Sequence, residues 1–182
     1  EGAGHAPVWR GHSDTETLLA GIAAWGLEAT LQRCVGMFAM ALWDRQTRTL
    51  QLARDRFGEK PLYYGWVGQG GGQAFVFASE LKALRAYPGF ANPVSREALA
   101  LYMRFMYVPA PHSIYQGIYK LEPGCVLSIS GDLPPAPGMA PRPPLMSGGL
   151  SLQRWWALGD AVVAGLQSPV TDEVEAINAL EQ

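Results

Sequence analysis

The sequence predicts an α+β fold whose strands are mostly antiparallel. Two pairs of apolar segments, residues 36–44 with 49–55 and residues 62–67 with 74–79, are each joined by a short polar or glycine-rich stretch, as in a β-hairpin. Segments with apolar residues at helical spacing precede and follow these pairs. Hairpins combined with separate helices are typical of the α+β class.

The first helix is predicted to begin after Ser13. Ser13 followed three residues later by Glu16 is the pattern of a capping box, in which each side chain binds a free N–H group at the helix start. Gly26 is expected to interrupt or end this helix, and residues 28–34 to add a short helical turn. The apolar stripe of the helix consists of Leu18, Ile22 and Trp25, widened by Leu19.

The next segments predict two hairpins. Residues 36–44 are almost continuously apolar, which indicates a strand covered on both faces, and residues 49–55 alternate leucine with polar residues. Residues 62–67 are predicted to form another strand. Residues 68–73, with three consecutive glycines, predict a flexible turn, and residues 74–79 predict the returning strand.

Two helices and one strand are predicted after the hairpins. Residues 79–87 favour a short helix with Ser79 as its cap, and a second helix is expected to begin at Ser95, after an Asn-Pro turn. Residues 120–130 predict a turn followed by an edge strand.

The character of the chain changes at residue 131. Residues 131–149 hold six of the chain's 14 prolines, and such a composition does not build a packed core. We therefore expect residues 131–154 to be a linker or an insertion. The final helix, near residues 171–182, shows an apolar face with nothing to cover it, which predicts that the chain is a fragment of a larger protein. That face consists of Val174, Ile177 and Leu180.

Composition argues against several classes of function. The 182-residue chain is 48% hydrophobic, enough for a sizeable core, and its formal net charge of −2 argues against a nucleic-acid binder. No apolar run approaches the ~20 residues of a membrane span. The N-terminus lacks the pattern of a secretory signal, so a cytoplasmic location is predicted. With two isolated cysteines, Cys34 and Cys125, and three scattered histidines, neither a disulfide framework nor a metal site is expected.

Three ordered sequence blocks point to a family. The first runs from GHSDTETLL to RDRFGEKPLYYG at residues 11–65, the second is FASELKAL at residues 77–84, and the third is YMRFMYVPAPHSIYQGIYKLEPG at residues 102–124. Together they closely resemble glutamine-hydrolysing asparagine synthetases over residues 10–130. The similarity resumes around residues 155–156.

The resemblance implies a particular architecture. In the family, this region belongs to a four-layer αββα sandwich of the N-terminal nucleophile hydrolase type. Residues 1–130 would be the C-terminal part of a class II (type-2) glutamine amidotransferase domain with an interdomain strap. Residues 131–154 would be the linker or insertion, and residues 155–182 the start of the synthetase domain.

The resemblance also implies a reaction for the parent protein, in which glutamine, aspartate and ATP give asparagine, glutamate, AMP and pyrophosphate. The family's nucleophile is an N-terminal cysteine whose own amine acts as the base. Residue 1 here is glutamate, and neither Cys34 nor Cys125 supplies an α-amine. No catalytic residue is therefore expected in this chain, and the isolated chain is expected to be inactive.

Cofactors and partners follow from the same resemblance. ATP and magnesium belong to the family's synthetase domain, and no cofactor is expected on this chain. The expected partners are glutamine, the synthetase domain of the same chain and a second copy in a homodimer, with no nucleic acid and no membrane. Two alternatives stay open. One is an amidotransferase of the same class with a saccharide or β-lactam acceptor, and the other is a non-catalytic interaction module that has lost the site.

One glutamine-binding residue is implied by the resemblance. Asp14, in the block S-D-x-E, matches the family's aspartate that pairs with the α-ammonium group of glutamine. As the first residue after a serine cap, Asp14 also suits the positive end of the helix dipole. Both roles can hold together.

The charged stretch RDRFGE is predicted to support the site structurally. A partly buried ion pair among Arg54, Asp55 and Arg56 would fix the strand ends beside the glutamine pocket and the domain boundary, and a surface charge cluster of little energetic value is the alternative. Gly58 is expected to adopt a positive φ or to allow a close backbone approach.

Overall fold

Two antiparallel β-sheets form the centre of the structure, a computed structural model that describes residues 9–68 and 72–180. The larger sheet has the strand order β1-β2-β6-β8-β7 and the smaller one β4-β3-β5. The pairings are antiparallel, which confirms the predicted α+β class. The strands are β1 (Ala39–Asp44), β2 (Thr49–Arg54), β3 (Tyr63–Val67), β4 (Ala74–Ala78), β5 (Ile118–Lys120), β6 (Cys125–Ser130), β7 (Leu145–Ser147) and β8 (Leu150–Arg154).

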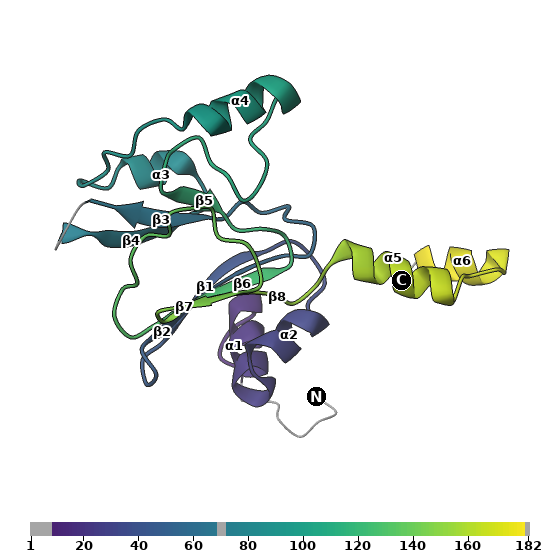
Figure 1. The fold of residues 1–182 in the computed structure, drawn as a ribbon. Helices are drawn as coiled ribbons and strands as arrows, with labels where there is room; N and C mark the ends of the chain where they lie inside the picture. Colours follow the sequence, from purple (N-terminus) through teal and green to yellow (C-terminus); the bar gives the residue numbers. More distant parts are fainter. Residues whose placement is uncertain (1–8, 69–71, 181–182) are drawn as a thin grey trace.

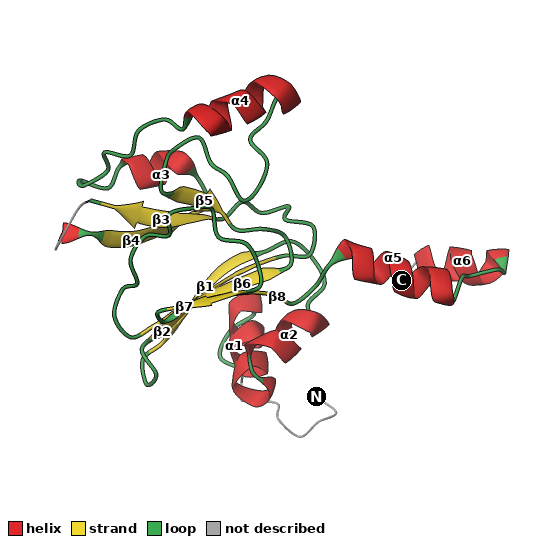
Figure 2. Ribbon diagram, viewed as in Figure 1, coloured by secondary structure: helices red, strands yellow, loops and turns green. Residues whose placement is uncertain are grey.

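Helices lie outside the two sheets (Figures 1 and 2). Helices α1 and α2 lie beside the larger sheet, α3 and α4 lie beyond the smaller sheet, and α5 and α6 project away from the body (Figure 1). The helices are α1 (Asp14–Trp25), α2 (Leu27–Arg33), α3 (Leu81–Arg85), α4 (Arg96–Phe105), α5 (Leu158–Gln167) and α6 (Glu173–Leu180).

The main core fills the space between the sheets. The larger sheet contributes Leu52, Leu127 and Leu152, whose side chains are at most 2% exposed. The smaller sheet contributes aromatic rings, among which the centroids of Tyr64 and Tyr119 lie 5.8 Å apart. Burying one leucine stabilises the fold by about 1.5–3 kcal/mol. The face-to-face packing of the sheets is therefore a principal source of stability.

Each sheet also has an outer apolar face that a helix covers. Leu31 of α2 packs with Ala53 of β2 on the larger sheet. Leu84 of α3 packs with Val67 of β3 and Ile118 of β5 on the smaller sheet. Because residues alternate between the faces of a strand, β2 presents Leu52 to the inner core and its neighbour Ala53 to α2.

Helix α1 begins as predicted at Ser13, whose side chain caps it. In a capping box, Glu16 would accept a hydrogen bond from the N–H of Ser13. Its carboxylate instead accepts from the N–H groups of Arg10 at 2.9 Å and Gly11 at 3.0 Å. Gly26, with φ of +80°, separates α1 from α2, as expected from its place in the sequence.

Both predicted hairpins are present, β1 with β2 and β3 with β4, although residues 69–71 of the second turn lie outside the described residues. Two strand positions were predicted wrongly. β1 is an edge strand rather than one covered on both faces, and Trp43 is 52% exposed. β6 was expected at an edge, yet it lies between β2 and β8. An apolar run does not reveal which distant segments will pair with it.

The helix caps after the hairpins differ in outcome. Ser95 caps α4 as predicted, since its side chain accepts a hydrogen bond from the N–H of Ala98 at 3.2 Å. Helix α3 begins one residue later than expected, with Glu80 at the cap position and no side-chain cap bond. Ser79 is therefore not the cap of α3, and it lines a cleft instead.

The proline-rich segment is part of the packed body, contrary to the expectation that its composition does not build a packed core. Its end forms the hairpin β7–β8, and Leu150 and Leu152 join the main core. The carbonyl of Pro134 accepts from the Trp66 indole N–H at 2.8 Å. Proline lacks only the N–H donor, so its carbonyl and apolar ring remain available to cover a core. The predicted domain boundaries themselves stay a prediction.

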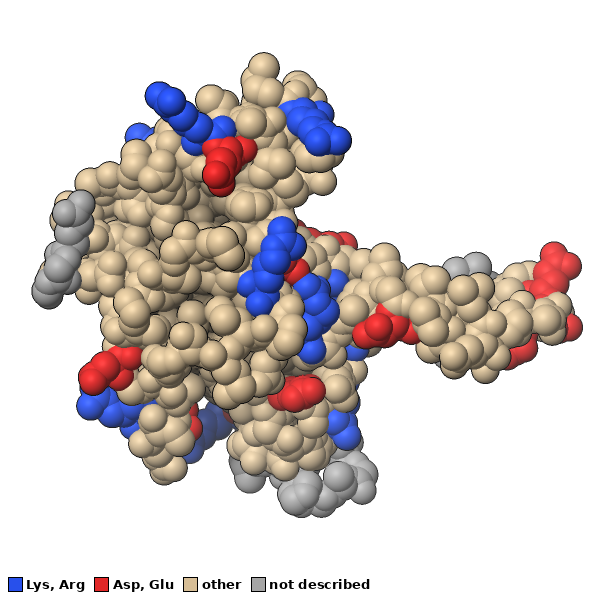
Figure 3. Space-filling view, viewed as in Figure 1, with Lys and Arg blue, Asp and Glu red and all other residues tan. Residues whose placement is uncertain are grey.

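The last two helices expose apolar side chains. Val174 is 64% and Ile177 is 48% exposed, as predicted, while the side chain of Leu180 lies outside the described residues. Across the described parts of the chain, no helix has both the length and the apolar character of a membrane span. On the face in Figure 3, basic side chains are interspersed with acidic ones over the body.

Gly65 is the position where the smaller sheet tolerates no side chain. A Cβ atom there would lie 2.1 Å from the carbonyl oxygen of Gly117, so Gly65→Ala has to push β3 and β5 apart. We expect the substitution to lower the free energy of unfolding by about 3 kcal/mol, the upper part of the range for overpacking. Chemical denaturation of the full-length protein measures this. Gly138→Ala is the control because its Cβ would meet nothing within 4 Å, and equal losses for both variants would contradict the packing argument.

Candidate functional site

A cleft of about 450 Å³ opens at the free edge of β1. Its position follows from the fold, because β1 has no neighbour on that side and α1 passes beside it. Most of the lining is apolar and comes from α1 and β1. The polar members of the lining are Asp14, Thr15, Lys60 and Ser79.

Asp14 lies at the first position of α1 and its exposed side chain borders this cleft. One carboxylate oxygen accepts from the N–H of Thr15 at 2.8 Å. A carboxylate has several further acceptor positions, so Asp14 can bind a cation in the cleft while it stabilises the helix start. The apolar part of the lining, including Leu18 and Ile22, lies further along the same helix.

The loop after β2 wraps around the carboxylate of Asp55. Its side chain is 1% exposed and accepts three backbone N–H groups, from Phe57 at 3.2 Å, Glu59 at 3.0 Å and Lys60 at 3.1 Å. Burial acts to raise the pKa of the Asp55 carboxyl, but the hydrogen bonds from Lys60 and Glu59 hold that pKa below its ordinary value. Asp55 is therefore a charged anchor for the loop that leads to the cleft.

Arg54 is the positive counterpart and is also satisfied by the backbone. Its guanidinium donates to the carbonyls of Lys60 at 2.8 Å, Leu121 at 2.5 Å and Gly58. Burial lowers the pKa of the guanidinium, and the charge of Asp55 acts in the opposite direction. The predicted structural role is supported by these contacts. The predicted ion pair is wrong, because no salt bridge of the described residues includes Arg54, Asp55 or Arg56. Arg54 binds backbone carbonyls instead, and Asp55 binds backbone N–H groups.

Gly58 completes this loop with a backbone that other residues rarely adopt. Its φ is +68°, and a Cβ atom would lie 2.8 Å from Pro123 and 2.9 Å from the guanidinium carbon of Arg54. Both predictions for Gly58, a positive φ and a close approach, are therefore met at once.

Arg56 ties the same loop to α2 and to the end of β8. Its guanidinium donates to the carbonyls of Gln32, at 2.8 Å, and Cys34, which lie at the C-terminal end of α2 where carbonyls lack helical partners. The guanidinium carbon also lies 5.2 Å from the ring centroid of Trp155. The sequence shows the charge of Arg56 but not these partners, which lie more than 20 residues away along the chain.

Neither cysteine has the environment of a nucleophile. Cys125 is fully buried, and burial raises the pKa of its thiol to about 11. Burial also raises the pKa of Cys34. A thiol must lose its proton to attack, so both side chains are suited to packing. In the part of the chain that the structure describes, no three His, Cys, Asp or Glu side chains gather as metal ligands.

The structure brings the predicted site residues together through one loop. Lys60, which follows the Asp55 anchor, lines the same cleft as Asp14. Arg54, at the end of β2, and Asp55 and Gly58, in the loop that follows, do not line the cleft. Sequence reasoning missed Lys60 and Ser79 as lining residues. A signal for Lys60 was present, because it directly follows the charged turn.

Residues 3–133 match the family described as the glutamine amidotransferase domain, and the chain belongs to this family. A Mycobacterium tuberculosis protein provisionally named a glutamine-hydrolyzing asparagine synthetase is 43% identical over 131 residues, which cover 70% of this chain and 19% of that protein.

Two Bacillus subtilis proteins extend the comparison. Glutamine-hydrolyzing asparagine synthetase 1 is 39% identical over 120 residues, covering 66% of this chain and 18% of its own length. Glutamine-hydrolyzing asparagine synthetase 3 is 33% identical over 153 residues, covering 81% of this chain and 22% of its own length. The chain thus spans about a fifth of the length of these relatives.

The Asp55 anchor predicts an acid-sensitive contribution to stability. Asp55→Asn replaces one acceptor oxygen by an NH2 group, which donates hydrogen bonds and cannot accept them, and it removes the charge. The free energy of unfolding at pH 7 should therefore fall by about 3 kcal/mol. Because the folded pKa lies below the unfolded value of about 4, the contribution of Asp55 is complete above pH 4 and is lost as the pH falls through the folded pKa. In denaturant titrations, the difference in stability between the two proteins should therefore narrow as the pH falls from 7 to 3. A pH-independent difference would contradict the anchor.

Gly58 predicts a second, separable effect. In Gly58→Ala, the alanine has to adopt a left-handed backbone, which costs about 1 kcal/mol of stability. Its Cβ atom also collides with Pro123 and Arg54. We expect a total loss of about 3 kcal/mol in the free energy of unfolding. Gly131→Ala is the matched control, because Gly131 has φ of +74° and open space around its Cβ position. If the two variants lose equal stability, the close approach at Gly58 contributes nothing.

Proposed function

We propose that this chain is the glutaminase-side part of a glutamine-dependent asparagine synthetase. The proposal rests on membership of the glutamine amidotransferase domain family and on the names of its relatives. The single structural observation that carries it is the Asp14 carboxylate at the border of a cleft of about 450 Å³.

The cleft suits glutamine in both charge and polarity. A free amino acid carries an α-ammonium group, and the Asp14 carboxylate is placed to accept hydrogen bonds from it. The apolar lining supplied by Leu18, Ile22 and Met40 suits the methylene carbons of the glutamine side chain. Asp14 then selects free amino acids over amides that lack the α-ammonium group.

The layer order supports the finer fold assignment. Helix α2, the larger sheet, the smaller sheet and helix α3 follow one another, with apolar clusters at each of the three interfaces. We assign this order to the four-layer αββα sandwich of N-terminal nucleophile hydrolases. The amidotransferase unit then extends through the β7–β8 hairpin, and the synthetase part begins within residues 155–182.

The parent protein then converts glutamine, aspartate and ATP to asparagine, glutamate, AMP and pyrophosphate, in the cytoplasm and as a homodimer. The nucleophile is assigned to an N-terminal cysteine of the parent, since Cys34 and Cys125 are unsuited to the role. The described residues offer no ligand cluster for magnesium.

Substitution of Asp14 tests the proposal directly. In the full-length protein, Asp14→Asn should raise the KM for glutamine about 10- to 100-fold, because a hydrogen bond between two charged groups is lost. Asparagine formation with ammonia as the nitrogen source should keep its rate. Initial rates with both nitrogen sources measure the split.

The control is Glu97→Gln, which removes an exposed acidic group from the first turn of α4, away from the cleft. It should leave both activities unchanged. Equal losses with glutamine and ammonia in Asp14→Asn would remove Asp14 from the glutamine site. Absence of asparagine formation with either nitrogen source in the unsubstituted protein would favour another acceptor or a non-catalytic role.

A further inference from the structure

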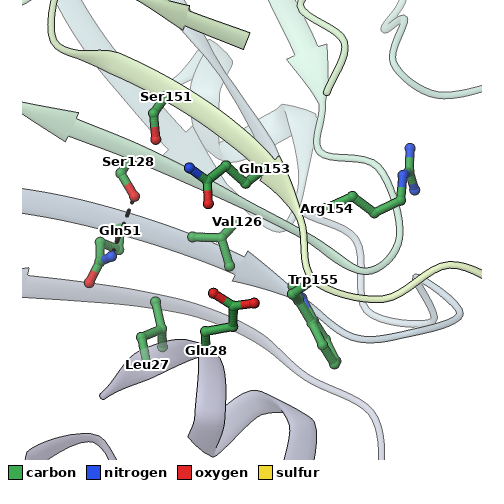
Figure 4. A pocket seen from close by; sticks show the side chains of 9 residues that line it. All are labelled: Leu27, Glu28, Gln51, Val126, Ser128, Ser151, Gln153, Arg154 and Trp155. Atoms are coloured by element: carbon green, nitrogen blue, oxygen red, sulfur yellow. Dashed lines mark hydrogen bonds between the residues drawn. The ribbon is translucent and has the colours of Figure 1, made fainter. Parts of the chain in front are cut away.

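A second, smaller pocket lies on the outer face of the larger sheet. It has a volume of about 240 Å³ and lies between the start of α2 and strands β2, β6 and β8 (Figure 4). None of its lining residues borders the Asp14 cleft. The volume corresponds to about eight water molecules in the liquid, so it admits a molecule of a few heavy atoms.

A row of neutral hydrogen-bonding side chains forms one wall of this pocket. Gln51, Ser128 and Ser151 lie directly opposite one another on the three strands. Neighbouring strands of a sheet are about 4.8 Å apart. The Gln51 amide donates to the Ser128 hydroxyl at 3.4 Å. Gln153 adds a second amide beside Val126. Amides and hydroxyls both donate and accept, so this wall can bind a polar ligand in more than one orientation.

The end of the pocket holds a buried donor with no partner. Trp155 is 9% exposed, and its indole nitrogen is the one buried side-chain polar atom of the described residues that lacks a hydrogen bond. Its ring contacts Phe38, at 6.3 Å between centroids, and the guanidinium of Arg56. Figure 4 shows the Trp155 side chain at the end of the pocket, and Trp155 belongs to the lining. Leaving such a donor without an acceptor costs about 1–3 kcal/mol.

The pocket also carries one uncompensated negative charge. Glu28, in the first turn of α2, turns its carboxylate into the pocket (Figure 4). No salt bridge among the described residues includes Glu28. Arg154 contributes to the lining, but its guanidinium is turned away (Figure 4), toward Glu122 and the carbonyl of Pro123 at 2.9 Å.

We propose that this pocket binds a small primary amine that carries an oxygen acceptor a few bonds from its nitrogen, as in an amino amide or an amino alcohol. The ammonium group pairs with the Glu28 carboxylate, and the oxygen accepts the Trp155 indole N–H. The amides and hydroxyls of the wall bind the remaining polar groups. The indole nitrogen is closed to solvent, so binding requires a local shift of the side chains that cover it.

The negative charge of Glu28 and the indole N–H donor of Trp155 together favour this class of ligand over others. An anion is disfavoured by Glu28, which has no cation beside it in the pocket. An apolar ligand would leave the indole N–H, the Glu28 carboxylate and the Gln153 amide without partners. A simple alkylamine would satisfy Glu28 but not Trp155, so the oxygen acceptor is part of the requirement.

Glycinamide is a suitable probe because it combines an ammonium group with an amide oxygen. We would titrate it into the full-length protein labelled with ¹⁵N-tryptophan and follow the indole resonances by NMR, with the Trp155 signal assigned from Trp155→Phe. A saturable shift of the Trp155 indole signal is expected. Acetamide, which lacks the ammonium group, should bind at least 10-fold more weakly.

Variants at exposed positions keep the test independent of folding. Glu28→Gln should weaken glycinamide binding at least 10-fold, whereas Glu97→Gln, at the same position in the first turn of another helix, should leave it unchanged. Asp14→Asn should also leave the Trp155 shift unchanged, which separates this pocket from the proposed glutamine site. The proposal is overturned if glycinamide gives no saturable shift of the Trp155 signal, if Glu28→Gln binds as well as the unsubstituted protein, or if acetamide binds equally well.

Discussion

The rest of the structure depends on the way in which two buried charges are satisfied by backbone groups after strand β2. Arg54 binds carbonyls and Asp55 binds N–H groups, so each charge fixes several residues of the chain at once. Through Leu121 the arginine reaches the chain that joins the smaller sheet to the larger one. The N–H of Gly124 also binds the carbonyl of Asp55 at 2.9 Å. Buried charges are costly unless they are fully bonded, and here the bonding joins both sheets to one loop.

The position of the proposed glutamine site follows from that loop. Lys60 contributes its N–H to Asp55 and its carbonyl to Arg54, so both polar atoms of its backbone are held behind the cleft that Lys60 lines. Asp14 approaches from the opposite side on α1, which α2 links to the outer face of the larger sheet. A rigid support on one side and a helix start on the other define the cleft.

Sequence patterns predicted local structure well and long-range pairing poorly. The cap at Ser13, the break at Gly26 and both hairpins follow from nearest-neighbour chemistry, so they were found. The interior place of β6 and the β7–β8 hairpin depend on contacts between distant segments, and prolines concealed them. For the site, the special backbone at Gly58 was predicted correctly. Asp14 borders the cleft, and its binding role stays a prediction. The partners of Arg54 and Asp55 were not, because backbone atoms carry no sequence signature.

The order of the strands along the chain has a consequence for how the protein folds. Along the chain, β1 and β2 of the larger sheet come first. The three strands of the smaller sheet, β3, β4 and β5, follow, and β6, β7 and β8 then complete the larger sheet. During synthesis on the ribosome, β2 therefore has an unpaired edge until residue 130 has emerged. Such non-local pairing slows folding. The exposed interval is the stage at which this chain is most open to chaperones and to aggregation.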